Sequence, residues 1–169
     1  QWVTDLTINA RGVCVDTALV TAAQELDIQT RTEYIDEAAK LSGLDNPNSV
    51  SQLTAWLQAE TGEEITDLRK DTVTSLLGKE LSSDKAHRML QIRRELGKTS
   101  NKKYDSLSAA TCADGRVRGL LQFYGANRTG RWAGRIVKPQ NLPRTYISGD
   151  LLPFARDLVK ARNAEALRW

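Results

Sequence analysis

Hydrophobic positions along this chain recur mostly at helical spacing. From Asp16 to Leu41 the apolar residues keep this spacing, and Gly43 follows as a stop signal. The pattern predicts one long helix with Asp16 as its N-cap. Before it, residues 1–15 carry apolar positions on both sides of Gly12. We expect a short helix there that turns through Gly12 into a short strand.

A small helical lobe is expected next along the chain. Ser49 can cap a helix that carries Trp56 and ends at residues 61–62, where Thr-Gly is a stop signal. A second short helix is predicted to begin near Asp71. Since Trp56 has helical spacing with apolar neighbours, we interpret it as core rather than as a platform for a nucleic-acid base.

A second long helix is predicted after this lobe. Ser82 or Ser83 would cap it, and its apolar positions continue to about Cys112 with an interruption at Gly97. Two long helices on either side of a small lobe favour an antiparallel helix pair with the lobe at its tip.

The apolar pattern no longer fits a helix after Ala113. Residues 117–124 favour strands or an extended hairpin, and Asp150 is predicted to cap a final helix. The expected fold class is therefore mainly α with a small β part (α+β). It combines a long antiparallel helix pair, a small helical tip and a short β hairpin.

Length and composition limit the class of protein. The chain has 169 residues, of which 40% are hydrophobic and 27% charged, enough for one domain with a core or for two small lobes that depend on each other. No apolar run approaches the roughly 20 residues of a membrane span, so we expect no membrane partner and a cytoplasmic location. The chain begins with Gln1 and has one methionine, which suggests a segment of a longer protein.

Cysteine and histidine usage argues against metal or thiol chemistry. Cys14 and Cys112 lie far apart, no second ligand pair flanks them, and His87 is the single histidine. We therefore expect no zinc site. Both cysteines are interpreted as small buried hydrophobic residues in a reducing compartment.

Positive charge is clustered, although the net charge is only +3. Such one-sided clusters indicate a polyanionic partner. The alternative is a solvated basic face, which fits the second cluster less well because glycines and aromatics lie between its arginines. The first cluster contains Lys85, Arg88, Arg93, Arg94, Lys98, Lys102 and Lys103, and the second, free of acidic residues, contains Arg116, Arg118, Arg128, Arg131, Arg135, Lys138 and Arg144.

The stretch 124–144 combines residue types that suit a surface for duplex nucleic acid. Its glycines let the backbone approach phosphates closely, its arginines neutralise them, and its amide side chains can hydrogen-bond to base edges. In the minor groove such groups meet a largely sequence-independent set of acceptors. This composition predicts a protein that binds duplexes of any sequence.

Three short motifs of this chain, at residues 11–16, 48–53 and 129–143, resemble those of family A DNA polymerases, the group that includes bacterial DNA polymerase I and many bacteriophage replicative enzymes. Residues 129–131, Thr-Gly-Arg, followed after eight residues by Gln-Asn-Leu-Pro at 140–143, are similar to the T-G-R…Q-N-I/L-P motif. Residues 11–16 resemble the segment before the thumb helix, and residues 48–53 resemble a thumb-tip segment. The motifs occur in family order over roughly residues 8–144. The Trp-Ala-Gly that follows Arg131 is more similar to the bacteriophage-type branch than to cellular members.

The resemblance implies a division of the chain and a set of DNA contacts. Residues 1–15 would lead from palm to thumb, residues 16–113 would form the helical thumb, and residues 114–169 would form a partial palm. Arg131 would reach the minor groove at the primer-terminal base pair. Gln140 and Asn141 would contact template or primer nearby. The full expected set of DNA-binding residues is Arg128, Thr129, Gly130, Arg131, Arg135, Gln140 and Asn141, with Lys98, Ser100, Asn101, Lys102 and Lys103 from the thumb.

The expected chemistry belongs to the parent protein. Family A enzymes carry two metal-binding aspartates in later motifs, which do not occur before Trp169. We therefore expect neither catalytic residues nor a cofactor in this segment, and Mg²⁺ in the full-length polymerase. The implied partners are a primer-template duplex and the remaining palm and fingers. Asp150 and Asp157 do not fit the aspartate motif and are interpreted as cap and surface residues.

Two other functions remain open at this point. The chain could be a stand-alone helical nucleic-acid-binding protein that uses the same surface. It could also be a protein-interaction scaffold whose basic face binds an acidic partner. Steep salt dependence of duplex binding would separate the first two functions from the scaffold.

Overall fold

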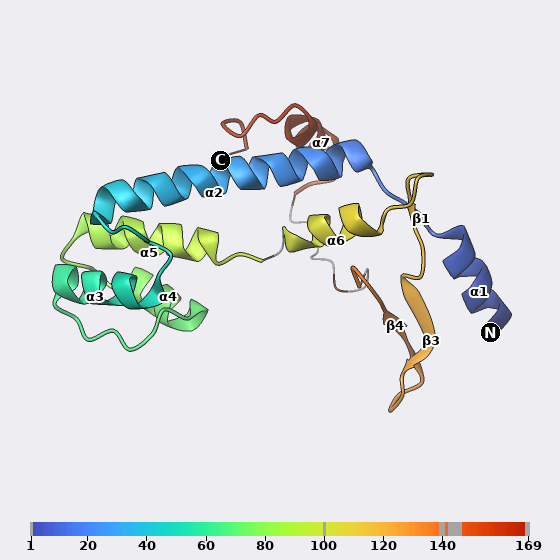
Figure 1. The fold of residues 1–169 in the computed structure, drawn as a ribbon, viewed down its shortest axis with the longest axis horizontal. Coiled ribbons are helices and arrows are strands. Elements are labelled where there is room, and N and C mark those ends of the chain that lie inside the picture. Colours follow the sequence, from blue (N-terminus) through green and yellow to red (C-terminus); the bar gives the residue numbers. More distant parts are fainter. Residues whose placement is uncertain (1, 100, 139–140, 142–146, 168–169) are drawn as a thin grey trace. The chain divides into compact units, whose positions relative to one another are not determined.

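Helices make up most of the chain in the computed structural model, which describes residues 2–99, 101–138, 141 and 147–167 (Figure 1). The chain divides into two compact units. Unit 1 comprises Gln1–Asp27 with Ser100–Trp169, and unit 2 comprises Ile28–Thr99. The helices, with a small amount of β structure, confirm the expected fold class. The two units do not have the bounds of the lead-in, thumb and partial palm expected from the resemblance. That division, into residues 1–15, 16–113 and 114–169, stays a prediction.

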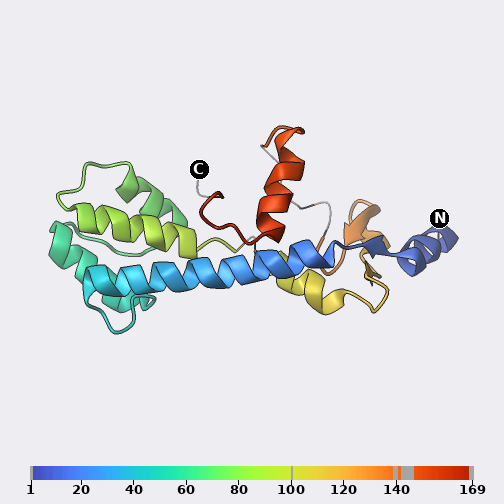
Figure 2. The ribbon, with the colours of Figure 1, turned by 90° about the horizontal axis from the view of Figure 1, so that it is seen from above.

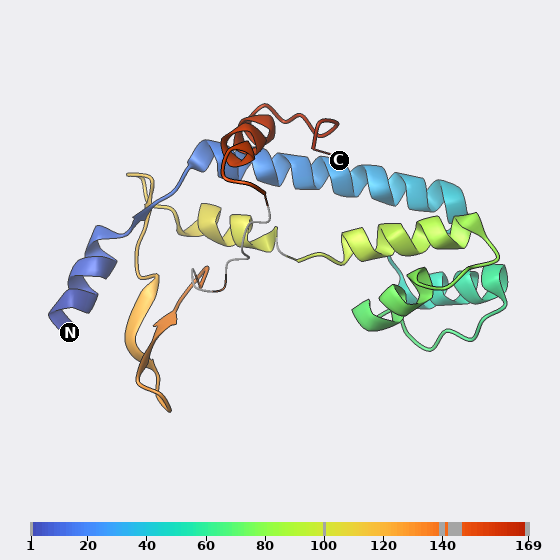
Figure 3. The ribbon, with the colours of Figure 1, turned by 180° about the vertical axis from the view of Figure 1, so that it is seen from behind.

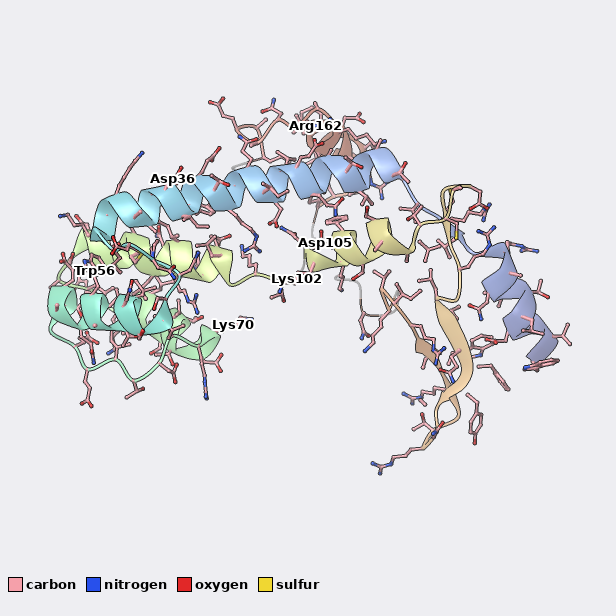
Figure 4. All side chains as sticks on the ribbon, in the orientation of Figure 1. Asp36, Trp56, Lys70, Lys102, Asp105 and Arg162 are labelled. Atoms are coloured by element: carbon pink, nitrogen blue, oxygen red, sulfur yellow. The ribbon has the colours of Figure 1, made fainter. Side chains whose placement is uncertain are left out.

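Unit 2 is built from helices around one core. It contains the second part of α2 (Thr17–Ser42) and the whole of α3 (Val50–Thr61), α4 (Lys70–Leu77) and α5 (Asp84–Leu96). Trp56 packs against this core, as expected (Figure 4). The buried members of the core are Ala38, Leu53, Leu57, Ile65, Leu68, Val73, Leu76, Ala86, Met89, Leu90 and Ile92.

The ends of these helices follow the predicted signals. The side chain of Ser49 accepts a hydrogen bond from the Gln52 amide, and that of Ser83 accepts one from the Ala86 amide at 3.3 Å. Ser83 is therefore the cap, and Ser82 is not. Gly62 ends α3 with a φ of 71°, in the left-handed region that glycine adopts without steric cost.

The predicted antiparallel helix pair is present in unit 2. Arg88 on α5 donates to both carboxylate oxygens of Glu37 on α2, at 2.6 and 2.9 Å. Near the other end of α5, Arg31 on α2 donates to the carbonyl oxygen of Leu96 at 3.1 Å. Since the residue number rises on α5 as it falls on α2, the two helices run in opposite directions.

Unit 1 contains shorter elements and two small antiparallel sheets. The strands β1 (Val13–Cys14) and β2 (Arg116–Val117) pair with each other, and β3 (Leu121–Ala126) pairs with β4 (Arg131–Gly134). Figure 3 shows the β3–β4 hairpin beside the first helix. A small buried cluster of Val117, Leu120 and Val137 forms a core in unit 1. The helices of unit 1 are α1 (Trp2–Arg11), the first part of α2, α6 (Lys102–Ala110) and α7 (Leu151–Lys160).

Polar contacts join the helices of unit 1. Asp105 on α6 accepts a hydrogen bond from Gln24 on α2 at 2.8 Å. Lys160 at the end of α7 forms an ion pair with Asp16 at 2.7 Å, and Arg162 pairs with Glu25. Asp16 directly precedes α2 and Glu25 lies on its first part. The two ion pairs therefore hold the end of α7 beside the first part of α2 (Figure 2).

The interruption of the second long helix is confirmed, whereas the predicted cap of the final helix is not. The second long helix is broken, with α5 ending at Leu96 and α6 beginning at Lys102, so the expected interruption at Gly97 is real. The final helix is present, but the side chain of Asp150 makes no capping hydrogen bond. The prediction that Asp150 caps α7 is therefore wrong. The first amides of α7 donate instead to the carbonyl oxygen of Ser148, at 3.0 and 3.1 Å.

The prediction that both cysteines are buried is also wrong. Cys14 and Cys112 are exposed free thiols. Cys14 lies on β1 opposite Arg116, and the amide of Cys112, which precedes β2, donates to the Arg116 carbonyl oxygen at 2.9 Å. Both residues of β1 are exposed, so β1 lies at the surface, whereas Val117 on β2 is buried.

Candidate nucleic-acid interface

The hairpin of β3 and β4 carries five of the twelve predicted site residues, Arg128, Thr129, Gly130, Arg131 and Arg135. We name residues 121–135 the basic hairpin. Its strands pair at Leu121 with Gly134 and at Ala126 with Arg131, with an irregularity in the register between them. The turn at 127–130 is closed by the amides of Thr129 and Gly130, which both donate to the Ala126 carbonyl oxygen, at 3.0 and 2.9 Å.

Helix α1 holds the outer edge of this hairpin. The side-chain amide of Asn9 donates to the Leu121 carbonyl oxygen at 2.8 Å and accepts from the Leu121 amide at 3.2 Å. The carboxylate of Asp5 accepts from the Phe123 amide at 3.0 Å. Two side chains of a helix thus make the hydrogen bonds that a further strand would make.

The arginines of the basic hairpin face solvent. Arg128, Arg131 and Arg135 are all exposed. Within the described part of the chain, none of the three has an acidic partner. Exposed guanidinium groups that lack an internal partner are available for phosphates or base edges.

The start of α6 brings further predicted residues into unit 1. Lys103 donates from its ammonium group to the carbonyl oxygen of Asn141 at 2.8 Å. Asn101 donates to Asp27 at 2.7 Å, and Lys102 is exposed on the first turn (Figure 4). The structure therefore joins the predicted thumb residue Lys103 to the Gln-Asn-Leu-Pro segment by a direct contact.

Gln140 and Ser100 lie outside the described residues. Lys98 belongs to unit 2, where its ammonium group forms an ion pair with Glu95 at 2.5 Å.

Two arginines of the second cluster serve the fold. Arg118 donates to both carboxylate oxygens of Asp114, at 3.0 and 2.6 Å, and to the Ala10 carbonyl oxygen at 2.9 Å. This contact lowers the pKa of Asp114 to about 2. Arg116 donates to the carbonyl oxygens of Arg11 and Gly12, at 3.3 and 3.2 Å. These arginines satisfy the last carbonyls of α1 and its exit.

The first cluster of basic residues, between Lys85 and Lys103, also contains an arginine that serves the fold. Arg88 is occupied by Glu37 and lies over the ring of Tyr34 at 5.9 Å, so it is structural. Other members line an open pocket of about 520 Å³ in unit 2 together with Lys70. Lys70 lies at the start of α4 (Figure 4). Two basic groups of the pocket share Glu95. The pocket is lined by Leu68, Lys70, Val73, Arg93, Arg94, Gly97, Lys98 and Thr99.

Sequence reasoning missed the aromatic contacts of the basic hairpin. The Phe123 ring meets Trp132 edge to face, with centroids 5.5 Å apart, and meets Tyr124 in the same way at 6.2 Å. Tyr124 has a φ of 55°. The only sequence signal was the pair of glycines at 125 and 130, which indicates tight packing without identifying the ring involved.

The described residues contain neither a candidate metal site nor a membrane-spanning helix. Among them, no three His, Cys, Asp or Glu side chains are grouped so that they could hold a metal ion. The helices that the structure describes include none that is long and apolar enough to cross a membrane.

The fold and site define a mainly helical protein with an exposed basic hairpin. The chain is similar to a protein of Bacillus phage SP02 named DNA polymerase, with 49% identity over 166 residues, or 98% of the chain. It spans only 25% of the length of that polymerase. No protein-family model matches the chain, and no solved structure matches it at a significant level.

Proposed function

We propose that this chain is the duplex-binding segment of a DNA-directed DNA polymerase of family A, in its bacteriophage-type branch. The observation that carries the proposal is the 49% identity with one quarter of a phage DNA polymerase. Supporting it are the exposed arginines of the basic hairpin, which lie in the Thr-Gly-Arg motif and beside it.

In this proposal the helical part corresponds to the thumb and the hairpin region to part of the palm. Arg131 enters the minor groove at the primer-terminal base pair, and Gln140 and Asn141 contact the nearby strands. Thr129 and Gly130 shape the turn. The remaining basic and polar residues bind phosphates without regard to sequence. These are Arg128, Arg135, Lys98, Ser100, Asn101, Lys102 and Lys103.

The apolar surface of unit 1 supports a further partner, the rest of the palm and the fingers. Ile28 and Val50 are the exposed large hydrophobic residues of unit 2. Unit 1 exposes many more, and Trp2 and Val3 on α1 are 68% and 69% exposed. Such a concentration of apolar surface is typical of a region that another segment covers. The others in unit 1 are Leu6, Ile8, Val13, Tyr124, Trp132, Ile136, Ile147, Leu151 and Phe154.

The chemistry of the parent would be nucleotidyl transfer with Mg²⁺ in the cytoplasm of a bacterial cell or phage-infected host. The part played by this chain would be to hold the duplex next to that chemistry. No step of the transfer is assigned to its residues.

The test is binding of the chain to two labelled DNAs of the same sequence, one with a recessed primer end and one blunt. We expect an affinity that falls steeply with salt. Replacing Arg131 by Ala should weaken binding to the primer end about tenfold and binding to the blunt duplex less. Fluorescence anisotropy measures both. The control is Lys40→Ala, which removes one exposed charge outside the hairpin.

Each contrary result points to a different function. Flat salt dependence or absence of DNA binding would favour the protein-interaction scaffold. Equal losses on both DNAs would reduce Arg131 to a phosphate contact, as a stand-alone nucleic-acid-binding protein would show.

A further inference from the structure

The backbone of Tyr124 adopts a conformation that is unfavourable for its residue type. Its φ of 55° lies in the left-handed region, which bulky residues rarely adopt. It occurs inside β3, where the pairing with β4 is irregular between Gln122 and Ala126. Because such a conformation persists only where its surroundings enforce it, it identifies a place where the hairpin has been shaped for something other than strand pairing.

The ring of Tyr124 lies against Gly130, on the opposite side of the turn. A Cβ atom at Gly130 would be 2.8 Å from Cε2 of the ring and 3.3 Å from Cζ. Any side chain at this position would displace the ring. Gly125 makes a similar close approach, since a Cβ there would be 2.5 Å from the Cβ of Ala133. Gly130 leaves the space that the ring occupies, and Gly125 lets β3 approach Ala133 on β4 closely.

The aromatic contacts reach both neighbours of Arg131. The Tyr124 ring lies against Gly130, which precedes Arg131. The Phe123 ring meets Trp132, which follows Arg131, with centroids 5.5 Å apart. Tyr124 remains 56% exposed, so its contact does little to build a core. The contact is local, because it is made at Gly130, the residue directly before Arg131.

We propose that Tyr124 is a positioning residue for Arg131. Its ring holds the turn at 127–130 so that the guanidinium group is presented to the primer-terminal base pair in one orientation. A turn that is fixed before binding loses less conformational entropy when DNA binds. The inference rests on the proposed function, since Arg131 is the group that meets the DNA.

Two substitutions at Tyr124 separate its ring from its backbone. Tyr124→Asn keeps a residue that tolerates a positive φ but removes the ring. Tyr124→Phe keeps the ring and removes only the hydroxyl group. We expect Tyr124→Asn to weaken binding to a primer end about fivefold, and Tyr124→Phe to stay within about twofold of the original.

The decisive measurement is a double-mutant cycle with Arg131→Ala, read on the primer-end and blunt duplexes. If Tyr124 acts through Arg131, Tyr124→Asn should reduce the preference for the primer end and add no loss to Arg131→Ala. A further loss in the double variant would mean that Tyr124 contacts DNA itself, which overturns the inference. If Arg131→Ala alone has no effect, the proposed role of Arg131 fails.

A second measurement tests the positioning without DNA. Amide order parameters from NMR relaxation should fall at Thr129, Gly130 and Arg131 in Tyr124→Asn and remain high in Tyr124→Phe. Equal order in both variants would show that the turn does not need the ring, and it would overturn the inference whatever Arg131 binds.

Discussion

At the scale of single residues, Gly12 packs closely against the backbone of β2. It joins α1 to β1 with a φ of 67°, and a Cβ atom there would lie 2.7 Å from the Val117 carbonyl oxygen and 2.9 Å from Cγ of Arg118. Neither of these atoms can move freely, because Val117 is in a strand and Arg118 is held by Asp114. Glycine is therefore required here for space as well as for conformation.

Replacing Gly12 by Ala should destabilise unit 1 more than the same change at Gly119. Gly119 has a φ of 70° but nothing within 4 Å of an added Cβ, so its replacement costs about 1 kcal/mol for conformation alone. Gly12→Ala adds a clash that costs a further ~1–3 kcal/mol. The free energy of unfolding from urea titration compares the two. Equal losses would mean that the strand moves aside without cost.

The residue scale also shows where prediction from sequence reached its limit. Ser49, Ser83 and Asp16 act as caps because a cap depends on atoms only a few residues away. The exposure of Cys14 depends on a strand about a hundred residues along the chain, which no local pattern reveals. The left-handed Tyr124 was missed for a different reason, because it accompanies an irregularity in the β3–β4 pairing that the apolar pattern does not show.

At the scale of elements, the start of α5 is held by two hydrogen bonds of one side chain. Besides accepting from the Ala86 amide, the Ser83 hydroxyl group donates to Glu60 on α3 at 2.6 Å. One side chain thus caps a helix and ties it to its neighbour in unit 2. The adjacent Ser82 is exposed and takes no part in the cap.

Ser83→Ala should therefore lower the stability of unit 2 by about 1 kcal/mol, as loss of a serine cap does elsewhere. Ser82→Ala is the matched control and should change stability by less than about 0.5 kcal/mol. Urea unfolding monitored by circular dichroism measures both. A larger effect of Ser82→Ala would show that the cap has been assigned to the wrong serine.

Elements were predicted well where a hydrophobic pattern and its end signals agree. The long helix from residue 17 to 42 and the two short helices of unit 2 follow such patterns. The candidate site was predicted as a list of residues but not as an arrangement. The link from Lys103 to Asn141 and the support of β3 by Asn9 are contacts across large sequence separations, which only the fold establishes.

At the scale of the whole molecule, apolar burial is unequal between the units. The core of unit 2 includes Leu53 and Leu57, which are almost completely buried, whereas among the described residues the buried cluster of unit 1 consists of Val117, Leu120 and Val137. Since burial of apolar side chains is the main source of stability, unit 2 should be the more stable of the two.

Leu57→Ala tests this difference. The free energy of opening that hydrogen exchange reports should fall by about 2–4 kcal/mol for the amides of unit 2. The same free energy for the amides of unit 1 should stay nearly unchanged. Val50→Ala, on the same helix but exposed, is the control and should have little effect. Hydrogen exchange resolved by residue gives the comparison. An equal loss in both units would mean that they unfold as one.

The bonds from α1 to β3 have a consequence for the behaviour of the chain in solution. A strand with unpaired amide and carbonyl groups is a template on which other chains can add and aggregate. On β3 the outward groups of Leu121 are taken by Asn9, and the outward amide of Phe123 is taken by Asp5. Two polar side chains of a helix thus keep a hairpin rich in aromatic residues from recruiting a second copy through its open edge.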